Sequence, residues 1–163
     1  MKSPIRPTDD EARALARRLL EEATFAALSY LDPSDDTPMV SRVALVAGPD
    51  GQPLSLMSDL SHHSAALQQN PVCSLLIGEP KVKGDPLTHP RLSLRATARF
   101  IRHGATEHCA LAGAFLAKQP KAKLYIGFTD FALVLFKPLG AHLNGGFGKA
   151  YLLDAEDIAA AMR

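Results

Sequence analysis

The sequence predicts helices in four parts of the chain, 9–23, 61–71, 105–118 and a last stretch that starts at Asp154, and apolar residues share one helical face in 9–23 and 105–118. In the first, Thr8 and Glu11 have the spacing of a capping box, and the alanines and leucines behind them share one face. Ser61 is placed to cap the second helix. In the last predicted helix, acidic residues follow Asp154 in the first turn, where negative charge favours a helix start.

Other segments have the composition and alternation of β-strands: 24–31, 39–47, 54–58, 72–78, 91–101, 131–138 and 141–153. The alternation is clearest in 91–101, where every second residue from Leu92 to Phe100 is apolar. Arg91, Arg95 and Arg99 then share the opposite, wet face. Turn-forming residues between the early segments predict hairpins that build an antiparallel meander.

The order of these elements predicts the fold class. Strands and helices do not alternate as they do in βαβ units, so a doubly wound parallel sheet is disfavoured. A chain of 163 residues is long enough for one core and needs no second domain. We expect one α+β domain over residues 1–163, a small and mainly antiparallel β-barrel with helices packed outside it.

The amino-acid composition argues against nucleic acid and membranes as binding partners. The chain has 18 Lys and Arg against 17 Asp and Glu, so no strong field draws it to nucleic acid or to a membrane surface. Cys73 and Cys109 lie in apolar stretches without metal-ligand spacing, which predicts two buried free thiols and suits a reducing cytoplasm. With no signal peptide and no membrane-spanning run, a soluble cytoplasmic protein is expected.

The segment 56–71 is the first candidate site, because a strand leads directly into a helix that begins Ser61, His62, His63, Ser64. Free N–H groups and the positive end of the helix dipole attract anions, and hydroxyl and imidazole donors would reinforce them. A phosphate is the expected ligand. The alternative is that Ser61 only caps the helix while both histidines face solvent. The pair lacks the spacing of a helical zinc site, so no metal is expected.

Arg42 is the second candidate, since a guanidinium among apolar strand residues could stabilise negative charge on a bound ring. The alternative is an arginine on the solvent face of an ordinary strand. Arg91 could reach a phosphate. Asp130 is an acid in an apolar neighbourhood that either serves a site or caps a turn. No hydrolase or nucleotide-binding motif is present, so no catalytic residue is assigned.

Glycines interrupt the last strand-like segment. Gly145, Gly146 and Gly148 surround Phe147, and such residues allow a sharp bend or a close approach to a ligand or a second chain. The corner is interpreted either as functional or as a bulge that closes a barrel.

In order, the segments SRVAL, LMSDLSHHSAALQQNPVCSLLIGEP, PRLSLRATARF, DFALVLFKPLGAHL and NGGFGKAYLL resemble the pyridoxamine 5′-phosphate oxidase-like, FMN-binding split-barrel superfamily. Within it, they resemble the haem-utilisation branch. The resemblance covers nearly the whole chain. It implies a six-stranded antiparallel split β-barrel that forms a homodimer, with FMN in two symmetric clefts between the subunits.

The superfamily's cofactor positions fall on Arg42 and Val43 along the isoalloxazine, Met57 and Ser58 beside the ribityl chain, Ser61, His63 and Ser64 around the phosphate, and Arg91 as a further contact. The resemblance thereby implies a flavin-dependent oxidoreductase with an unknown small-molecule substrate. Members of the oxidase type place Arg and Lys where this chain has His62, His63 and Ser64, so phosphate affinity would depend on histidine protonation.

The branch resemblance implies an alternative, a protein that binds, degrades or transfers haem in the same cleft without flavin chemistry. It places Asp130 near the cleft and assigns its lining to Asn144, Gly145, Gly146 and Lys149. Many relatives carry a ligating histidine near or beyond their C-terminus, whereas this chain has none after His142. His142 is therefore the candidate haem ligand, although strand alternation also allows it to be packed or exposed. A third hypothesis is a dimeric scaffold with an empty cleft.

Overall fold

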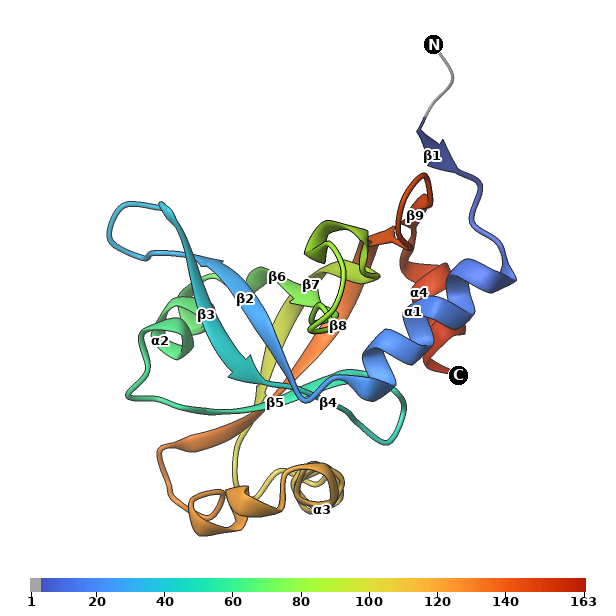
Figure 1. Cartoon of the computed structure of the whole chain (residues 1–163). Helices are drawn as coiled ribbons and strands as arrows, with labels where there is room; N and C mark the ends of the chain where they lie inside the picture. The colour runs from blue at the N-terminus through green and yellow to red at the C-terminus, as the bar shows by residue number, and fades with distance from the viewer. Residues whose placement is uncertain (1–3) are drawn as a thin grey trace.

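The computed structural model describes residues 4–163, which form an α+β fold around one twisted β-sheet (Figure 1). The strands of this part of the chain are β1 (Ile5–Arg6), β2 (Phe25–Leu31), β3 (Pro38–Ala44), β4 (Val46–Ala47), β5 (Pro53–Ser58), β6 (Val72–Ile77), β7 (Arg91–Ile101), β8 (Phe131–Asn144) and β9 (Ala150–Leu153). The helices are α1 (Asp10–Glu22), α2 (His62–Gln69), α3 (His108–Lys118) and α4 (Ala155–Met162), with 3₁₀ turns η1 (Pro86–Thr88) and η2 (Pro120–Leu124).

The sheet is mixed and mainly antiparallel. Its order is β1-β9-β8-β7-β6-β2-β3, while β5 pairs with both β4 and β8, and β1 with β9 is the parallel pair. Leu45 separates β3, which pairs with β2, from β4, which pairs with β5. Over residues 4–163 the ladder therefore does not close into a continuous barrel. Nine strands are found there where the resemblance implied six, and two-residue strands account for part of the difference.

β8 differs from its expected form. The sequence predicted strands at 131–138 and 141–153, but β8 runs without interruption to Asn144, because Gly140 (φ 145°) accommodates a register shift opposite Arg95 and Ala96 of β7. The glycine corner is a hairpin turn between β8 and β9, in which the Gly145 N–H donates to the Lys149 carbonyl at 2.7 Å. The bulge expected at that corner lies instead in the β7–β8 ladder.

The helices follow the expected spans closely. The N-cap of α1 is Asp9, whose carboxylate accepts the Ala12 N–H at 2.8 Å, so the predicted capping role of Thr8 is wrong. The Thr8 hydroxyl donates instead to the Leu152 carbonyl at 2.8 Å. The predicted start of α4 is confirmed, because Asp154 forms a complete capping box. α3 begins three residues later than expected, and no described helix has the length and apolarity to span a bilayer.

The core has two parts. The larger fills the space between the sheet, α1 and α4, with Leu28, Leu94 and Phe136 fully buried. The smaller lies under α3, at the opposite end of the sheet from β9 (Figure 1), and is centred on Phe115 and Leu133. Arg13 ties α1 to α4 through an ion pair with Asp157 at 2.9 Å. This packing holds α1 across one end of the sheet, where the helix borders a cavity that is described below.

Candidate functional site

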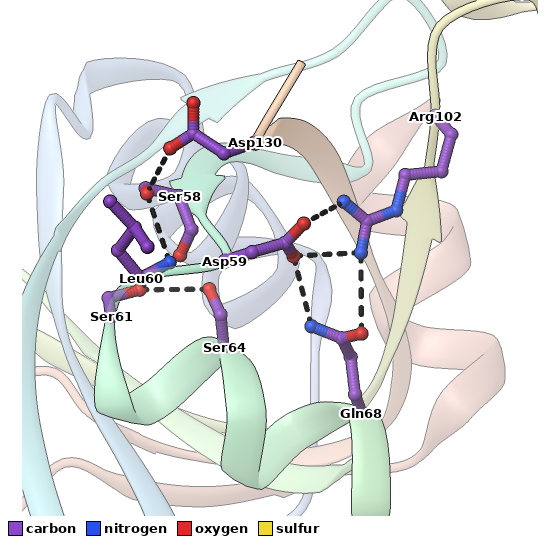
Figure 2. A network of polar contacts seen from close by, with 8 residues as sticks. All are labelled: Ser58, Asp59, Leu60, Ser61, Ser64, Gln68, Arg102 and Asp130. Atoms are coloured by element: carbon purple, nitrogen blue, oxygen red, sulfur yellow. Dashed lines mark hydrogen bonds and ion pairs between the residues drawn. The ribbon is translucent and has the colours of Figure 1, made fainter. Parts of the chain in front are cut away.

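The corner between β5 and α2 carries a network of hydroxyl groups (Figure 2). Ser58 donates to Asp130 at 2.6 Å and accepts the Leu60 N–H at 3.1 Å. The Ser61 hydroxyl lies 2.6 Å from the Ser58 carbonyl oxygen and 2.9 Å from the hydroxyl of the buried Ser64. Ser61 occupies the N-cap position as predicted, but its side chain does not cap the helix. These hydroxyls are therefore engaged with one another, and Asp130 holds the end of β5.

An ion pair fixes the same corner from the other side. Asp59 accepts two hydrogen bonds from Arg102, at 2.6 and 2.8 Å, and one from Gln68 of α2 at 3.1 Å (Figure 2). The hydrogen bonds from Arg102 lower the pKa of Asp59, and the same contact raises the pKa of Arg102. These contacts link the segment before α2, the last turn of α2 and the residue that follows β7.

The two histidines of α2 have different environments. His62 is linked through Nε2 to Asp32 at 3.3 Å and through Nδ1 to the Tyr30 hydroxyl at 3.2 Å, while half of its side chain stays exposed. His63 is half-buried, and desolvation lowers its pKa, so it remains neutral at pH 7. Protonation of His63 would therefore have to overcome the cost of its burial. The predicted phosphate contact of Ser61, His63 and Ser64 stays a prediction.

A large cavity lies elsewhere, between α1 and the segment that joins β6 to β7. It measures about 560 Å³, which is within the range of small-molecule sites. Leu15 and Leu19 of α1 and Phe25 of β2 supply apolar surface. The remaining lining residues are Arg18, Glu22, Ala23, Thr24, Gly78, Glu79, Lys81, His89 and Pro90. We call this cavity the α1 groove.

Cationic groups border the α1 groove. The exposed side chains of Arg18 and Lys81 make no ion pair with any residue from 4 to 163, so both charges are available to a ligand. His89 accepts the Lys81 backbone N–H at Nδ1, at 2.7 Å. Arg91 donates to the carbonyls of Leu87 and His89 at 2.9 and 3.3 Å, which shapes the loop over the groove.

Two smaller cavities adjoin the α1 groove and share lining residues with it. One, of about 170 Å³, contains Arg42 and Arg91, and the Arg42 guanidinium lies 5.4 Å from the centroid of the Phe25 ring. The other, of about 250 Å³, contains Gly145 and Lys149. The predicted site residues thus form two groups within one protomer: one at the groove and one at the β5–α2 corner.

The remaining predicted residues contribute differently. The side chains of Val43 and Met57 belong to the buried core, so a cofactor could contact only their backbone. The Asn144 side chain accepts the Gly146 N–H at 2.9 Å and supports the hairpin turn. His142 is exposed on β8, opposite Ser93 and Leu152, and lines none of the three cavities.

The sequence analysis missed the groove residues Arg18, Lys81 and His89. Arg18 lies in a predicted helix of which only the cap and the apolar face were interpreted, and the other two lie in a loop without a motif. An available signal was the cluster of basic residues at Lys81, Lys83 and Arg91 around a histidine, next to an apolar strand. This cluster indicates a binding site only when α1 is known to pack against that loop.

Comparisons with known proteins assign the family. The model of the CREG β-barrel family matches residues 7–159. This chain belongs to the CREG β-barrel family. Chloroplastic non-canonical heme oxygenase HOZ of Arabidopsis thaliana is 31% identical to this CREG-family chain over 119 residues, 73% of the chain and 35% of the relative. The chain spans about a third of that relative's length.

Two solved structures extend the comparison of this CREG-family chain. A heme binding protein from Mycobacterium smegmatis is 28% identical with a TM-score of 0.83, covering 96% of this chain and 62% of that one. A Clostridium acetobutylicum protein of the pyridoxinephosphate oxidase family, related to general stress protein 26, is 13% identical with a TM-score of 0.69, covering 93% of this chain and 99% of that one. The latter likeness concerns the fold alone. Together the matches confirm the predicted resemblance to the oxidase-like superfamily and its haem-utilisation branch.

Proposed function

We propose that this protein binds haem, with the α1 groove as the binding site. The observation that carries the proposal is the similarity to a heme oxygenase and to a heme binding protein, together with a groove of suitable size and chemistry. The predicted alternative, haem binding, thereby becomes the preferred hypothesis over flavin chemistry. Addition of a reductant to the complex in air would test whether the protein also degrades haem.

The residues of the α1 groove suit an amphipathic dicarboxylate. Leu15, Leu19 and Phe25 offer apolar contact to a planar ring system. Arg18 and Lys81 are unpaired cations within the described chain and can neutralise carboxylates at the rim. These contacts support binding of a porphyrin through its ring face and propionates, and Glu22 and Glu79, which also line the groove, are the opposing charges that Arg18 and Lys81 would have to outweigh. When bound, haem would supply the redox chemistry, while the apolar and cationic residues of the groove would hold and orient it.

We also propose a homodimer formed through the outer face of β2, β3 and β6. Val40, Val72 and Leu76 on this face are 65%, 55% and 47% exposed. Ladder pairs place Arg42, Ala27 and Leu76 side by side across the three strands, so the apolar residues form one surface next to Arg42.

FMN remains a second candidate because of the start of α2. No side chain caps this helix, and the Ser64 N–H already donates to the Ser61 carbonyl at 3.1 Å, so the N–H groups of His62 and His63 would be the ones to bind a phosphate. The fold likeness to the pyridoxinephosphate oxidase family agrees with such a role. Against it, the serine hydroxyls of the corner are already paired with one another and with Asp130.

Titration of the purified protein with haem and, separately, with FMN tests both candidates. We expect a saturable Soret shift with haem, and at least a tenfold weaker haem affinity for the charge-reversal variant Arg18→Glu, because the rim loses a cation and gains an anion. Arg99→Glu is the matched control, since Arg99 lies on β7, pairs with Glu107 at the N-cap of α3 and does not line the groove. No Soret shift at saturating haem would reject haem binding, and quenched FMN fluorescence would then favour the flavin.

A further inference from the structure

His89 is the histidine of the α1 groove, and its hydrogen bond determines which nitrogen carries the proton. Its Nδ1 lies 2.7 Å from the backbone nitrogen of Lys81. A backbone N–H can only donate, so Nδ1 must present its lone pair. The ring is therefore neutral in this arrangement, with its proton on Nε2.

This proton arrangement disagrees with a role as an axial ligand. A histidine that binds a metal uses a free lone pair on one nitrogen and donates the N–H of the other. In His89 the lone pair of Nδ1 is already used, and Nε2 is a donor. Binding iron through Nε2 would move the proton to Nδ1, where it would face the Lys81 N–H and break that hydrogen bond.

The α1 groove offers no replacement for this ligand within residues 4–163. Its lining contains no cysteine, methionine or tyrosine, the other side chains that commonly bind haem iron. His142 is exposed on β8 and lies outside the cavity lining. What the groove does offer is three donors, namely the cations Arg18 and Lys81 and the Nε2–H of His89.

We propose that the α1 groove recognises tetrapyrroles through their carboxylates and apolar ring face, and not through the metal. This inference rests on the proposed haem site and names its ligand class: porphyrin dicarboxylates with or without iron. His89 then acts as a hydrogen-bond donor beside Arg18 and Lys81. A porphyrin without iron keeps all of these protein contacts, whereas a porphyrin without free carboxylates loses its contacts with Arg18, Lys81 and His89.

Comparison of three ligands tests this proposal on the intact protein: haem, protoporphyrin IX and protoporphyrin IX dimethyl ester. We expect the dissociation constants of haem and protoporphyrin to agree within about threefold, and that of the ester to be at least about tenfold higher. Arg18→Glu should weaken haem and protoporphyrin equally, while the control Arg99→Glu leaves both unchanged. His89→Ala should leave the Soret maximum of the haem complex in place.

The outcomes separate the two proposals. Failure of haem to bind would reject the proposed function itself. Haem binding at least tenfold tighter than protoporphyrin, with a Soret maximum that moves in His89→Ala, would keep haem as the ligand but overturn metal-independent recognition. Nitrogen NMR of the histidine-labelled free protein provides an independent readout, because a proton found on Nδ1 of His89 would contradict the inferred tautomer.

Discussion

The two cysteines illustrate how burial controls chemistry at the level of single residues. Cys73 is buried in the core, and desolvation raises the pKa of its thiol to about 12, whereas Cys109 on α3 is exposed. The expectation of two buried thiols is therefore right for Cys73 and wrong for Cys109. Helical spacing placed Cys109 near apolar neighbours, but its position on α3 faces away from the smaller core.

We predict that a thiol reagent such as iodoacetamide modifies Cys109 rapidly in the native protein and leaves Cys73 unmodified, because only the thiolate reacts. Mass spectrometry should show one adduct per native chain and two after unfolding in denaturant. A Cys109→Ser variant that still takes up one adduct at the same rate would contradict the burial of Cys73.

The Asp59–Arg102 pair predicts a pH dependence of stability. Its hydrogen bonds lower the pKa of Asp59 below the ordinary value of 3.8, so the stabilisation is complete above that value and is lost as the pH falls through the lowered pKa. Since both side chains are more than one-third exposed, the contribution at neutral pH is limited to about 1 kcal/mol.

Arg102→Met should therefore lower the free energy of unfolding by up to about 1 kcal/mol at pH 7, and this difference should shrink in strongly acidic solution. Urea denaturation at several pH values measures it. Arg95→Met is the control, because Arg95 lies on β7, the strand that ends directly before Arg102, and makes no ion pair within residues 4–163. A difference that is constant with pH would assign the loss to packing instead.

At the scale of elements, Gly78 is the position where the end of β6 meets the start of β7. Its φ is +105°, and an added Cβ would lie 2.6 Å from the Pro90 carbonyl oxygen and 3.2 Å from the Leu19 side chain. Both the backbone conformation and the close approach require glycine. Because Gly78 also lines the α1 groove, the same contact positions the loop that carries Lys81 and His89.

Gly78→Ala should lower the free energy of unfolding by more than about 1 kcal/mol, since neither the backbone nor Pro90 can shift freely. Gly113→Ala is the matched control: it lies inside α3 with nothing within 4 Å of the added methyl group, and should stabilise by about 0.5–1 kcal/mol. Thermal unfolding of both variants measures the contrast. Equal stability of the two variants would show that the loop relaxes around the methyl group added at Gly78.

Element spans could be predicted where the signal was local. The apolar period identified α1, the acidic residues after Asp154 identified the start of α4, and alternation identified β7. The continuity of β8 through Gly140 could not be predicted, because it depends on a register shift against β7 that only the paired strands determine.

At the scale of the whole molecule, the exposed apolar face of β3 and β6 makes the oligomeric state testable. We predict a particle of about twice the 17.5 kDa chain mass, and dissociation towards the monomer in Val40→Lys, because a buried unpaired charge opposes association. Val82→Lys is the control, since Val82 is fully exposed in the loop between β6 and β7. Light scattering after gel filtration gives the mass, and a wild-type monomer would reject the dimer.

The sequence by itself determined the elements, the fold class and the family resemblance. Each depends on patterns between neighbours along the chain, such as the 3.6-residue and two-residue periods and the ordered motifs. It also singled out Ser58, Ser61 and Ser64, which are close in sequence, but the hydrogen bond between Ser58 and Asp130 is known only from the structure.

Only the tertiary structure decided which polar groups border the α1 groove. Arg18 lies on α1, while Lys81 and His89 lie in the loop after β6, and their approach depends on how α1 packs across the end of the sheet. The hydrogen bond that places the His89 proton on Nε2 likewise forms within a folded loop. Such contacts arise from the packing of distant segments, which local periodicity does not encode.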